Sequence, residues 1–338
     1  MKIKIIYIVV FLSMSCLLSA VQLPNLQVEY SLDWSFWGGY YPQQEKKSYN
    51  YSDLLDLKAG FRSAPASNQQ TWLFISFYND EYEKKVRLEE TGYTFQSASW
   101  QTGFLYKRET GIGAFSRIYS LDVTHKYYRQ PAITSYNFGG LSFAYGTPQS
   151  QLFLKCGGNE YNNIIISCGW KRETAKASRN ISLLLQGRDD YYQRQLAALN
   201  YEGYNYSRMH WLYNAFSTGF VMDTLKNKKE VFLFTGLSEL IINITQSIRL
   251  GGNFNFEYRD NQEMEKSATL LTALDYKKNT INLLFRVDEW FLDNQMQSAD
   301  LLLTHNFTPG MSTSLKSRLI FPQNSKKIYE LGLQIKIK

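Results

Sequence analysis

Histidine and cysteine, the residues that most often carry metal or nucleophilic chemistry, are scarce in this sequence. Among 338 residues there are three cysteines and three histidines, His125, His210 and His305. The histidines stand singly, no HExxH pair or G-x-S-x-G turn occurs, and the cysteine spacing matches no zinc motif. We therefore expect no catalytic residues, no metal and no cofactor, and predict that the chain is not an enzyme.

Long apolar runs and basic tracts are missing as well. After residue 20 no stretch of about 18 apolar residues occurs, which excludes membrane-spanning helices in the rest of the chain. The net charge of +7 falls to 35 − 30 = +5 once Lys2 and Lys4 are removed with the first twenty residues. This charge is mild and no nucleic-acid motif accompanies it, so nucleic acid is not an expected partner. Repeats and linkers are absent too, which predicts one large domain.

The first twenty residues have the features of an export signal. Lys2 and Lys4 give a basic start, residues 5–12 an apolar middle, and Ser19-Ala20 a small-residue exit. We expect cleavage after Ala20, leaving a signal peptide at residues 1–20 and a barrel domain at residues 21–338. An uncleaved membrane helix and lipid attachment at Cys16 are the alternatives.

What the sequence does have is strict alternation of apolar and polar residues. Residues 280–289, 311–321 and 329–337 each place their apolar side chains on one parity, which in the first run comprises Ile281, Leu283, Phe285 and Val287. This alternation predicts β-strands with one apolar and one polar face, and a transmembrane strand needs roughly 9–11 residues. The 25 tyrosines and the 16% aromatic content agree with a membrane barrel, because barrels concentrate Tyr and Trp at both interfaces.

The connections between predicted strands give a second signal. Bacterial barrels have an even number of strands, short periplasmic turns and longer outside loops. Counting back from the C-terminus, we predict outside connections at residues 322–327, 291–297, 259–266, 124–135 and 80–95, and inside turns at residues 308–310, 277–279, 146–148, 108–111 and 64–67. This phase predicts an all-β, single antiparallel transmembrane β-barrel of eighteen strands with both termini periplasmic. Sixteen strands is the alternative, if two segments within residues 149–210 are not separate strands.

The polar parity of these strands predicts a wet interior. A charged residue on the lipid face would cost about 2–4 kcal/mol near the bilayer midplane, so the charges must face inward. Barrels of roughly 16–18 strands leave an aqueous channel, and charges of mixed sign around it filter solutes by size and charge. The residues that we expect to line the lumen are Glu29, Asp33, Lys58, Arg62, Arg249, Glu257, Arg286, Lys316, Arg318 and Glu330.

Three segments do not fit this pattern simply. Arg117 shares its parity with apolar neighbours and would point toward lipid unless a bulge re-aims it. Residues 71–78 are apolar on both faces and are expected to meet an inward-folded loop or a partner. Residues 80–95, rich in Glu and Lys, are the longest predicted connection and our candidate for a constriction loop.

Two cysteines remain after the signal, on adjacent predicted strands. A turn at residues 157–163 would place Cys156 opposite Ile164 rather than Cys168. We therefore expect two free thiols. A disulfide, which export permits, would need a shifted register.

Together, the signal, the alternating strands, the aromatic content and the phase of the connections resemble Gram-negative outer-membrane β-barrels of the porin-like kind. The terminal strand, YELGLQIKIK, resembles the signal that such barrels present to the barrel-assembly machinery, although it ends in Lys338 and not in an aromatic residue. The resemblance implies an outer-membrane location, the lipid bilayer and the assembly machinery as partners, and a channel for small hydrophilic solutes. The oligomeric state is left open, and a homo-oligomer is one alternative.

Other classes of protein stay open beside the pore. A non-conducting barrel could serve as an adhesin, a scaffold or a secretion component. An outer-membrane hydrolase is less favoured, since its least implausible starting point, His125, is better explained as a surface histidine. A soluble β-sandwich or propeller is the alternative to a membrane barrel.

Overall fold

The structure is a computed structural model in which residues 26–40, 49–63, 68–79, 84–112, 134–147, 149–158, 164–187, 194–223, 229–259, 264–288, 296–322 and 327–337 are described. All regular elements among them are strands: β1 (Leu26–Tyr40), β2 (Tyr49–Ser63), β3 (Gln69–Asn79), β4 (Lys84–Gln96), β5 (Trp100–Ile112), β6 (Thr134–Thr147), β7 (Ser150–Gly158), β8 (Ile164–Glu173), β9 (Ala177–Gln186), β10 (Arg194–Tyr206), β11 (His210–Asp223), β12 (Lys229–Asn243), β13 (Ile248–Arg259), β14 (Glu265–Tyr276), β15 (Asn279–Asp288), β16 (Met296–Thr308), β17 (Met311–Pro322) and β18 (Ile328–Ile337). In the described ranges no helix is long and apolar enough to cross a membrane.

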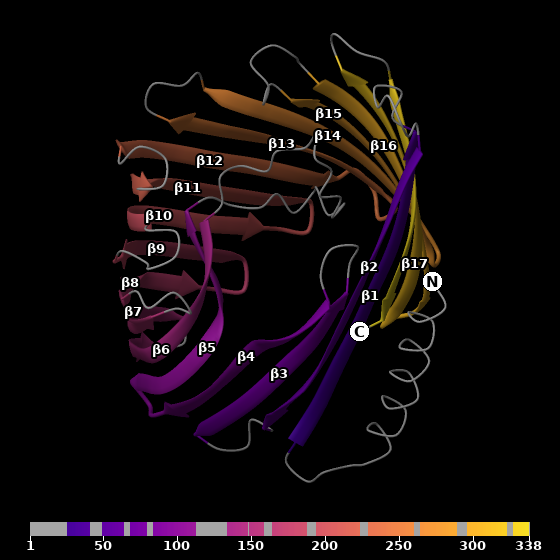
Figure 1. The fold of residues 1–338 in the computed structure, drawn as a ribbon. Coiled ribbons are helices and arrows are strands. Elements are labelled where there is room, and N and C mark those ends of the chain that lie inside the picture. Colours follow the sequence, from indigo (N-terminus) through magenta and orange to yellow (C-terminus); the bar gives the residue numbers. More distant parts are fainter. Residues whose placement is uncertain are drawn as a thin grey trace.

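The strands form one closed antiparallel ring. Each strand pairs with its neighbours in sequence, and β1 also pairs with β18, so the 18-stranded sheet has no free edge. Figure 1 shows the strands curving around a central space. Because the ring is closed, every strand forms backbone hydrogen bonds with a neighbour on each side. This is the condition for a sheet to lie in lipid. The prediction of an eighteen-stranded barrel is confirmed, and the alternative of sixteen strands is wrong.

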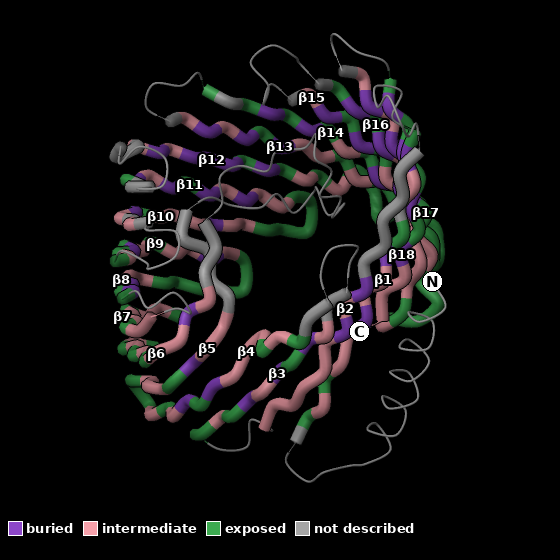
Figure 2. The backbone as a smooth tube through the Cα atoms, in the orientation of Figure 1, coloured by how far each residue is buried: buried purple, intermediate pink, exposed green. Residues whose placement is uncertain are grey.

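The two faces of the ring differ in chemistry, as period-two alternation requires. Large apolar side chains are exposed on the outer face around the ring, for example Leu141 on β6, Leu270 on β14 and Leu331 on β18. The opposite parity carries buried polar residues such as Thr269 and Ser298. Figure 2 shows this alternation as repeated changes of burial along single strands. The outer face therefore offers an apolar surface and the inner face a largely polar one.

One part of the outer face is buried. Leu32, Leu55 and Leu57 have outward parity on β1 and β2 yet are almost inaccessible. Their cluster is completed by the partly buried side chains of Trp34, Phe77, Ile335 and Ile337. Since these residues come from β18, β1, β2 and β3, apolar packing as well as hydrogen bonding holds the strands where the ring closes.

The two rims of the ring differ in their connections. The rim at which β1 begins and β18 ends, here called the chain-end rim, has tight turns such as Lys277–Lys278 and Pro309–Gly310. Lys277 has a φ of 54°, the left-handed conformation that a two-residue hairpin turn needs. The opposite rim carries the longer intervals between strands, the longest being residues 113–133. The predicted alternation of short and long connections is therefore present.

The sequence-based prediction was wrong on β3 to β6. Residues 80–95 are not a long connection, because Lys84–Gln96 is β4, and the turn expected at residues 108–111 lies within β5. A bulge explains the error: Ile75 pairs with Leu88 but Phe74 pairs with Glu90, so Glu89 is an extra residue. Outward side chains are therefore even-numbered before the bulge and odd-numbered after it, which hides the alternation.

Two other residues singled out in the sequence lie outside this description. Arg117 and His125 lie outside the described residues, and the connection expected at residues 124–135 ends inside β6. Elsewhere the boundaries agree better, because the turns expected at residues 277–279 and 308–310 lie where β14 meets β15 and where β16 meets β17.

Candidate functional site

The inner face of the ring is the candidate site, and its charged part is built by strand register. On β16, β17 and β18 the register places Asp300 opposite Arg318 and Arg318 opposite Glu330. The Arg318 guanidinium donates to both carboxylate oxygens of Asp300 at 2.8 and 2.9 Å, and its Nη1 lies 3.6 Å from Glu330 Oε2. Their side chains are only 2%, 1% and 3% exposed. Such a buried arrangement is stable only while the cation and carboxylates remain together.

A second polar network crosses the place where the ring closes. Asp33 on β1 accepts hydrogen bonds from Gln334 Nε2 at 2.8 and 3.0 Å and pairs with Lys336 Nζ at 3.3 Å. On its other side Asp33 lies opposite Asp56 of β2 in register. Two carboxylates directly opposite each other repel, and Lys336 offsets part of that repulsion.

Cationic side chains on β2 lie over aromatic rings of β3. The Arg62 guanidinium is 5.9 Å from the ring centre of Trp72 and 5.6 Å from that of Phe74, and Lys58 Nζ is 4.8 Å from Phe74. Arg62 Nε also lies 3.5 Å from Glu29 Oε1. Aromatic faces attract these cations and hold them along the inner wall.

The ten residues expected to line the lumen all lie on the inner parity of their strands. Five of them are buried, namely Glu257, Arg286, Lys316, Arg318 and Glu330. The other five are more accessible, namely Glu29, Asp33, Lys58, Arg62 and Arg249. Ion pairs within the set join Arg62 to Glu29 and Arg318 to Glu330. Arg249 instead pairs with Asp275 at 2.9 Å.

The sequence-based set missed partners that complete these networks. Asp300, Asp275 and Gln334 contribute the contacts described above, and buried Glu239 adds a further inward carboxylate on β12. Asp300 could have been found, because Ser298 and Asp300 share the polar parity of β16. The pairings themselves depend on register between strands, which no single strand encodes.

The inner face is not polar everywhere. A buried cluster consists of Trp72, Phe74, Leu105, Phe138, Ile165, Leu184, Ala198 and Leu233. These residues come from seven strands between β3 and β12, and register gives all of them the inward parity. Residues 71–78 are apolar on both faces because the inward side chains of Trp72 and Phe74 on β3 belong to this cluster.

One strand reaches across the ring. β5 contacts β10 and β11, with which it shares no ladder. Figure 1 shows the far end of β5, with β6, in front of β9 to β11 and inside the curve of the sheet. The interior is therefore narrowed on this side by β5, and the constriction that we expected from residues 80–95 is not formed by β4, which is a wall strand.

Features of an active centre are not seen in the described part of the chain. No group of three or more His, Cys, Asp or Glu side chains there could hold a metal ion. His210 Nδ1 lies 2.9 Å from Ser207 Oγ and His305 Nδ1 lies 2.8 Å from Asn279 Oδ1, both near the chain-end rim. These contacts order turns, and neither histidine has a nucleophile aligned by a third group.

The two thiols expected to be free are free. Cys156 and Cys168 have outward parity on β7 and β8 and form no disulfide. The register is two residues away from the expected one, because Cys156 pairs with Ile166 and not with Ile164. Cys168 pairs instead with Leu154.

Comparisons of the whole chain find its likeness in structure and not in sequence. No family model matches, and no curated protein matches. Among solved structures, Pseudomonas aeruginosa OccK11 (OpdR) is similar with a TM-score of 0.60 at 9% identity, over 93% of this chain and 96% of that one. Pseudomonas aeruginosa OpdK with vanillate gives 0.60 at 8% identity over 93% and 98%. A BenF-like porin from Pseudomonas fluorescens Pf-5 gives 0.58 at 8% identity over 93% and 98%. At these identities the likeness establishes a shared barrel fold.

Proposed function

We propose that the protein is an outer-membrane pore that conducts small hydrophilic solutes. The observation that carries the proposal is the contrast between the two faces of one closed ring. The outer face exposes large apolar side chains, whereas the inner face carries Asp33, Lys58, Arg62, Arg249 and their partners. Such charges need water or one another, and rings of about 16–18 strands are wide enough to hold water.

The solved barrels of the same fold support this proposal. One of them is a BenF-like porin, and another, OpdK, was solved with vanillate, a small organic molecule. By analogy, we propose a small solute as cargo here. Because β5 reaches β10 and β11 and an apolar cluster lines part of the wall, the path is narrower than the ring, and passage depends on solute size.

The remaining assignments follow from a pore in this membrane. Residues 1–20 act as the export signal and residues 21–338 form the barrel. The chain-end rim, with its tight turns, is the periplasmic side. The chain is inserted by the barrel-assembly machinery, requires no cofactor and catalyses no reaction.

The test is single-channel recording of purified, detergent-solubilised protein added to a planar lipid bilayer. Stable, discrete open steps are expected, with an open-state current that rises with salt concentration. Folded protein, verified by a heat-dependent shift of mobility on an SDS gel, that gives no step in repeated preparations would contradict the pore. Detergent without protein is the control for leakage.

A non-conducting barrel is the second candidate, and one observation favours it. The interior apolar cluster is buried, and β5 crosses toward β10 and β11, so part of the interior is filled. Liposome swelling separates the two candidates independently of single-channel recording. A pore admits small sugars and excludes larger ones, whereas a filled scaffold excludes both.

A further inference from the structure

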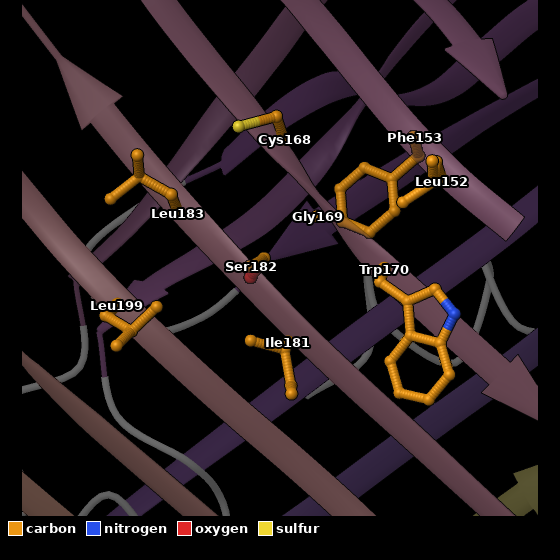
Figure 3. A pocket seen from close by; sticks show the side chains of 9 residues that line it. All are labelled: Leu152, Phe153, Cys168, Gly169, Trp170, Ile181, Ser182, Leu183 and Leu199. Atoms are coloured by element: carbon orange, nitrogen blue, oxygen red, sulfur yellow. The ribbon is translucent and has the colours of Figure 1, made fainter.

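The outer face of β7 to β10 contains an apolar groove, shown in Figure 3. Its volume is about 480 Å³. The outward side chains that line it are Leu152, Cys168, Trp170, Ile181, Leu183 and Leu199. Cys168 stands in register between Leu154 and Leu183, and its short side chain leaves the depression between larger neighbours.

The groove has a polar end that faces the chain-end rim. Trp170, the groove residue nearest the end of β8, donates its indole N–H to Ser150 Oγ at 3.0 Å. Tryptophan in barrels collects at membrane interfaces, where its ring meets apolar chains and its N–H meets polar groups. Trp170 therefore marks the level at which the apolar groove gives way to the polar rim.

Two arginines lie immediately beyond that level. Arg172 and Arg179 are directly opposite each other in the β8–β9 register, next to the Trp170–Ile181 pair and on the same outer face. Like charges in this position destabilise a sheet. Lys176, exposed in the turn between the two strands, adds a third positive charge nearby.

In the described part of the chain, the groups that contact Arg179 are neutral. The Arg179 guanidinium donates to Ser178 O, Tyr204 O and Asn205 Oδ1 at 2.7, 2.9 and 2.8 Å, all of them neutral acceptors. Glu173 is paired with Lys171 at 2.7 Å. Within the described ranges, Arg172 and Arg179 form no ion pair with a carboxylate.

We propose that this surface binds one anionic phospholipid, with its phosphate between Arg172 and Arg179 and one acyl chain in the groove. The proposal rests on the proposed function, because it needs the chain-end rim to lie at a membrane interface. A phosphate accepts several charge-assisted hydrogen bonds and neutralises two facing cations. The groove begins directly beside the arginine pair. One lipid can therefore place its head group at the arginines and an acyl chain in the groove.

A second copy of the chain fits this surface less well. A two-fold symmetric contact places the same patch on both subunits. Two such patches would bring four arginines and two Lys176 side chains together without a counter-charge. Charge complementarity therefore favours a lipid.

The test is native mass spectrometry of the full-length barrel in detergent, titrated with phosphatidylglycerol or with phosphatidylcholine. The wild-type protein should retain one phosphatidylglycerol in preference to phosphatidylcholine. Arg172→Gln/Arg179→Gln should lose about thirtyfold in affinity for phosphatidylglycerol, if each cation contributes about 1 kcal/mol. The matched control, Lys277→Gln/Lys278→Gln, removes two charges from another turn of the same rim and should bind like the wild type.

Two further variants test the two halves of the site. Arg172→Gln alone leaves the hydrogen bonds of Arg179 in place and should lose about fivefold, which keeps the test decisive if the double variant does not fold. Cys168→Phe fills the groove and should lower affinity for the phospholipid without changing any charge. Far-UV circular dichroism and the heat-dependent gel shift verify folding.

Several results would overturn the proposal. If the arginine variant and the lysine control lost equal affinity for phosphatidylglycerol, only the general charge of the rim would matter. Competition by inorganic phosphate at lipid-like concentrations would mean a site for a free anion. A lipid-free dimer abolished by Cys168→Phe would mean that a second copy covers the groove.

Failure of this site and failure of the pore give different results. Conduction without a preference for phosphatidylglycerol contradicts the lipid site alone. Lipid retention by a barrel that never conducts contradicts the pore alone. Arg172→Gln/Arg179→Gln lies on the outer face and should conduct like the wild type.

Discussion

The inward side chains of two parts of the ring, here called its two walls, differ in chemistry. From β13 through β18 to β2, the inward face carries most of the buried charges, which pair as in Asp300–Arg318–Glu330, and only a small apolar cluster around Leu284 and Leu302. Between β3 and β12, inward residues such as Phe138, Ile165 and Leu184 instead form one buried apolar cluster. The outer face is apolar over both walls, so the difference lies only in what fills or wets the inside.

This difference decides how easily each strand can be recognised from the sequence. Alternation of apolar and polar residues is clear where the inward residues of a strand are mostly polar, as in β13 and β17. On β8 the inward Ile165 and outward Ile164 and Ile166 are all apolar, so period two disappears from the sequence although the strand is regular. A weak alternation in a barrel sequence therefore indicates an apolar inner wall as readily as it indicates a loop.

The largest loss of stability should come from a carboxylate placed on the apolar wall, and the same change on the polar wall is the comparison. Ile165→Asp buries an unpaired charge in the apolar cluster and should destabilise the barrel by more than about 4 kcal/mol or prevent folding. Ser298→Asp is buried as well but lies opposite Arg286 in register, so its charge has a partner and it should destabilise the barrel clearly less. Urea unfolding in detergent measures both, and similar losses would refute the contrast between the walls.

A smaller but still large loss is expected from breaking the buried ionic group. Arg318→Ala leaves Asp300 and Glu330 without the cation between them and should cost about 3–5 kcal/mol in unfolding free energy. Arg249→Ala is the control, because its pair with Asp275 is about one-third exposed and should contribute under about 1 kcal/mol. Equal effects would show that burial does not distinguish the two pairs.

Charge reversal on the polar wall should alter ion selectivity without large loss of stability. Arg62→Glu adds negative charge to the inner face and should move the reversal potential in a salt gradient toward cation selectivity. Arg172→Glu makes the same change on the outer face and should leave the reversal potential where it was. A shift of equal size in both variants would remove Arg62 from the conduction path.

The smallest effect is expected from removing the bulge in β4. Deletion of Glu89 would make the outward parity continuous from Val86 to Tyr93 and should cost about 1–2 kcal/mol, because Ser76 Oγ loses the carboxylate to which it donates a hydrogen bond. Deletion of Leu271 from the regular strand β14 is the control, because it turns every following side chain to the wrong face and should prevent folding. Failure of both variants to fold would mean that the bulge is required by the barrel.

The sequence therefore supports the barrel more firmly than it supports the site. The total of eighteen strands and the phase of the connections outside β3 to β6 follow from local alternation and turn residues, although the total was reached without β4. β4 was missed because one extra residue, Glu89, reversed its parity. The bidentate contact of Arg318 with Asp300 and the approach of β5 to β10 depend on register and on curvature of the whole sheet, which no local pattern contains.

The pairing of β1 with β18 has a consequence for the way the molecule forms. The hydrogen bond between Gln334 and Asp33 joins residues 301 positions apart, so this ladder completes the longest loop in the chain. Loop closure of that length is entropically unfavourable, and contacts between distant residues form slowly. The hairpins around the rest of the ring connect near neighbours and can assemble first. We therefore expect the zipping of the first strand onto the last to be the final, rate-limiting event of biogenesis, and a chain truncated before Ile328 to accumulate as an open, unclosed sheet.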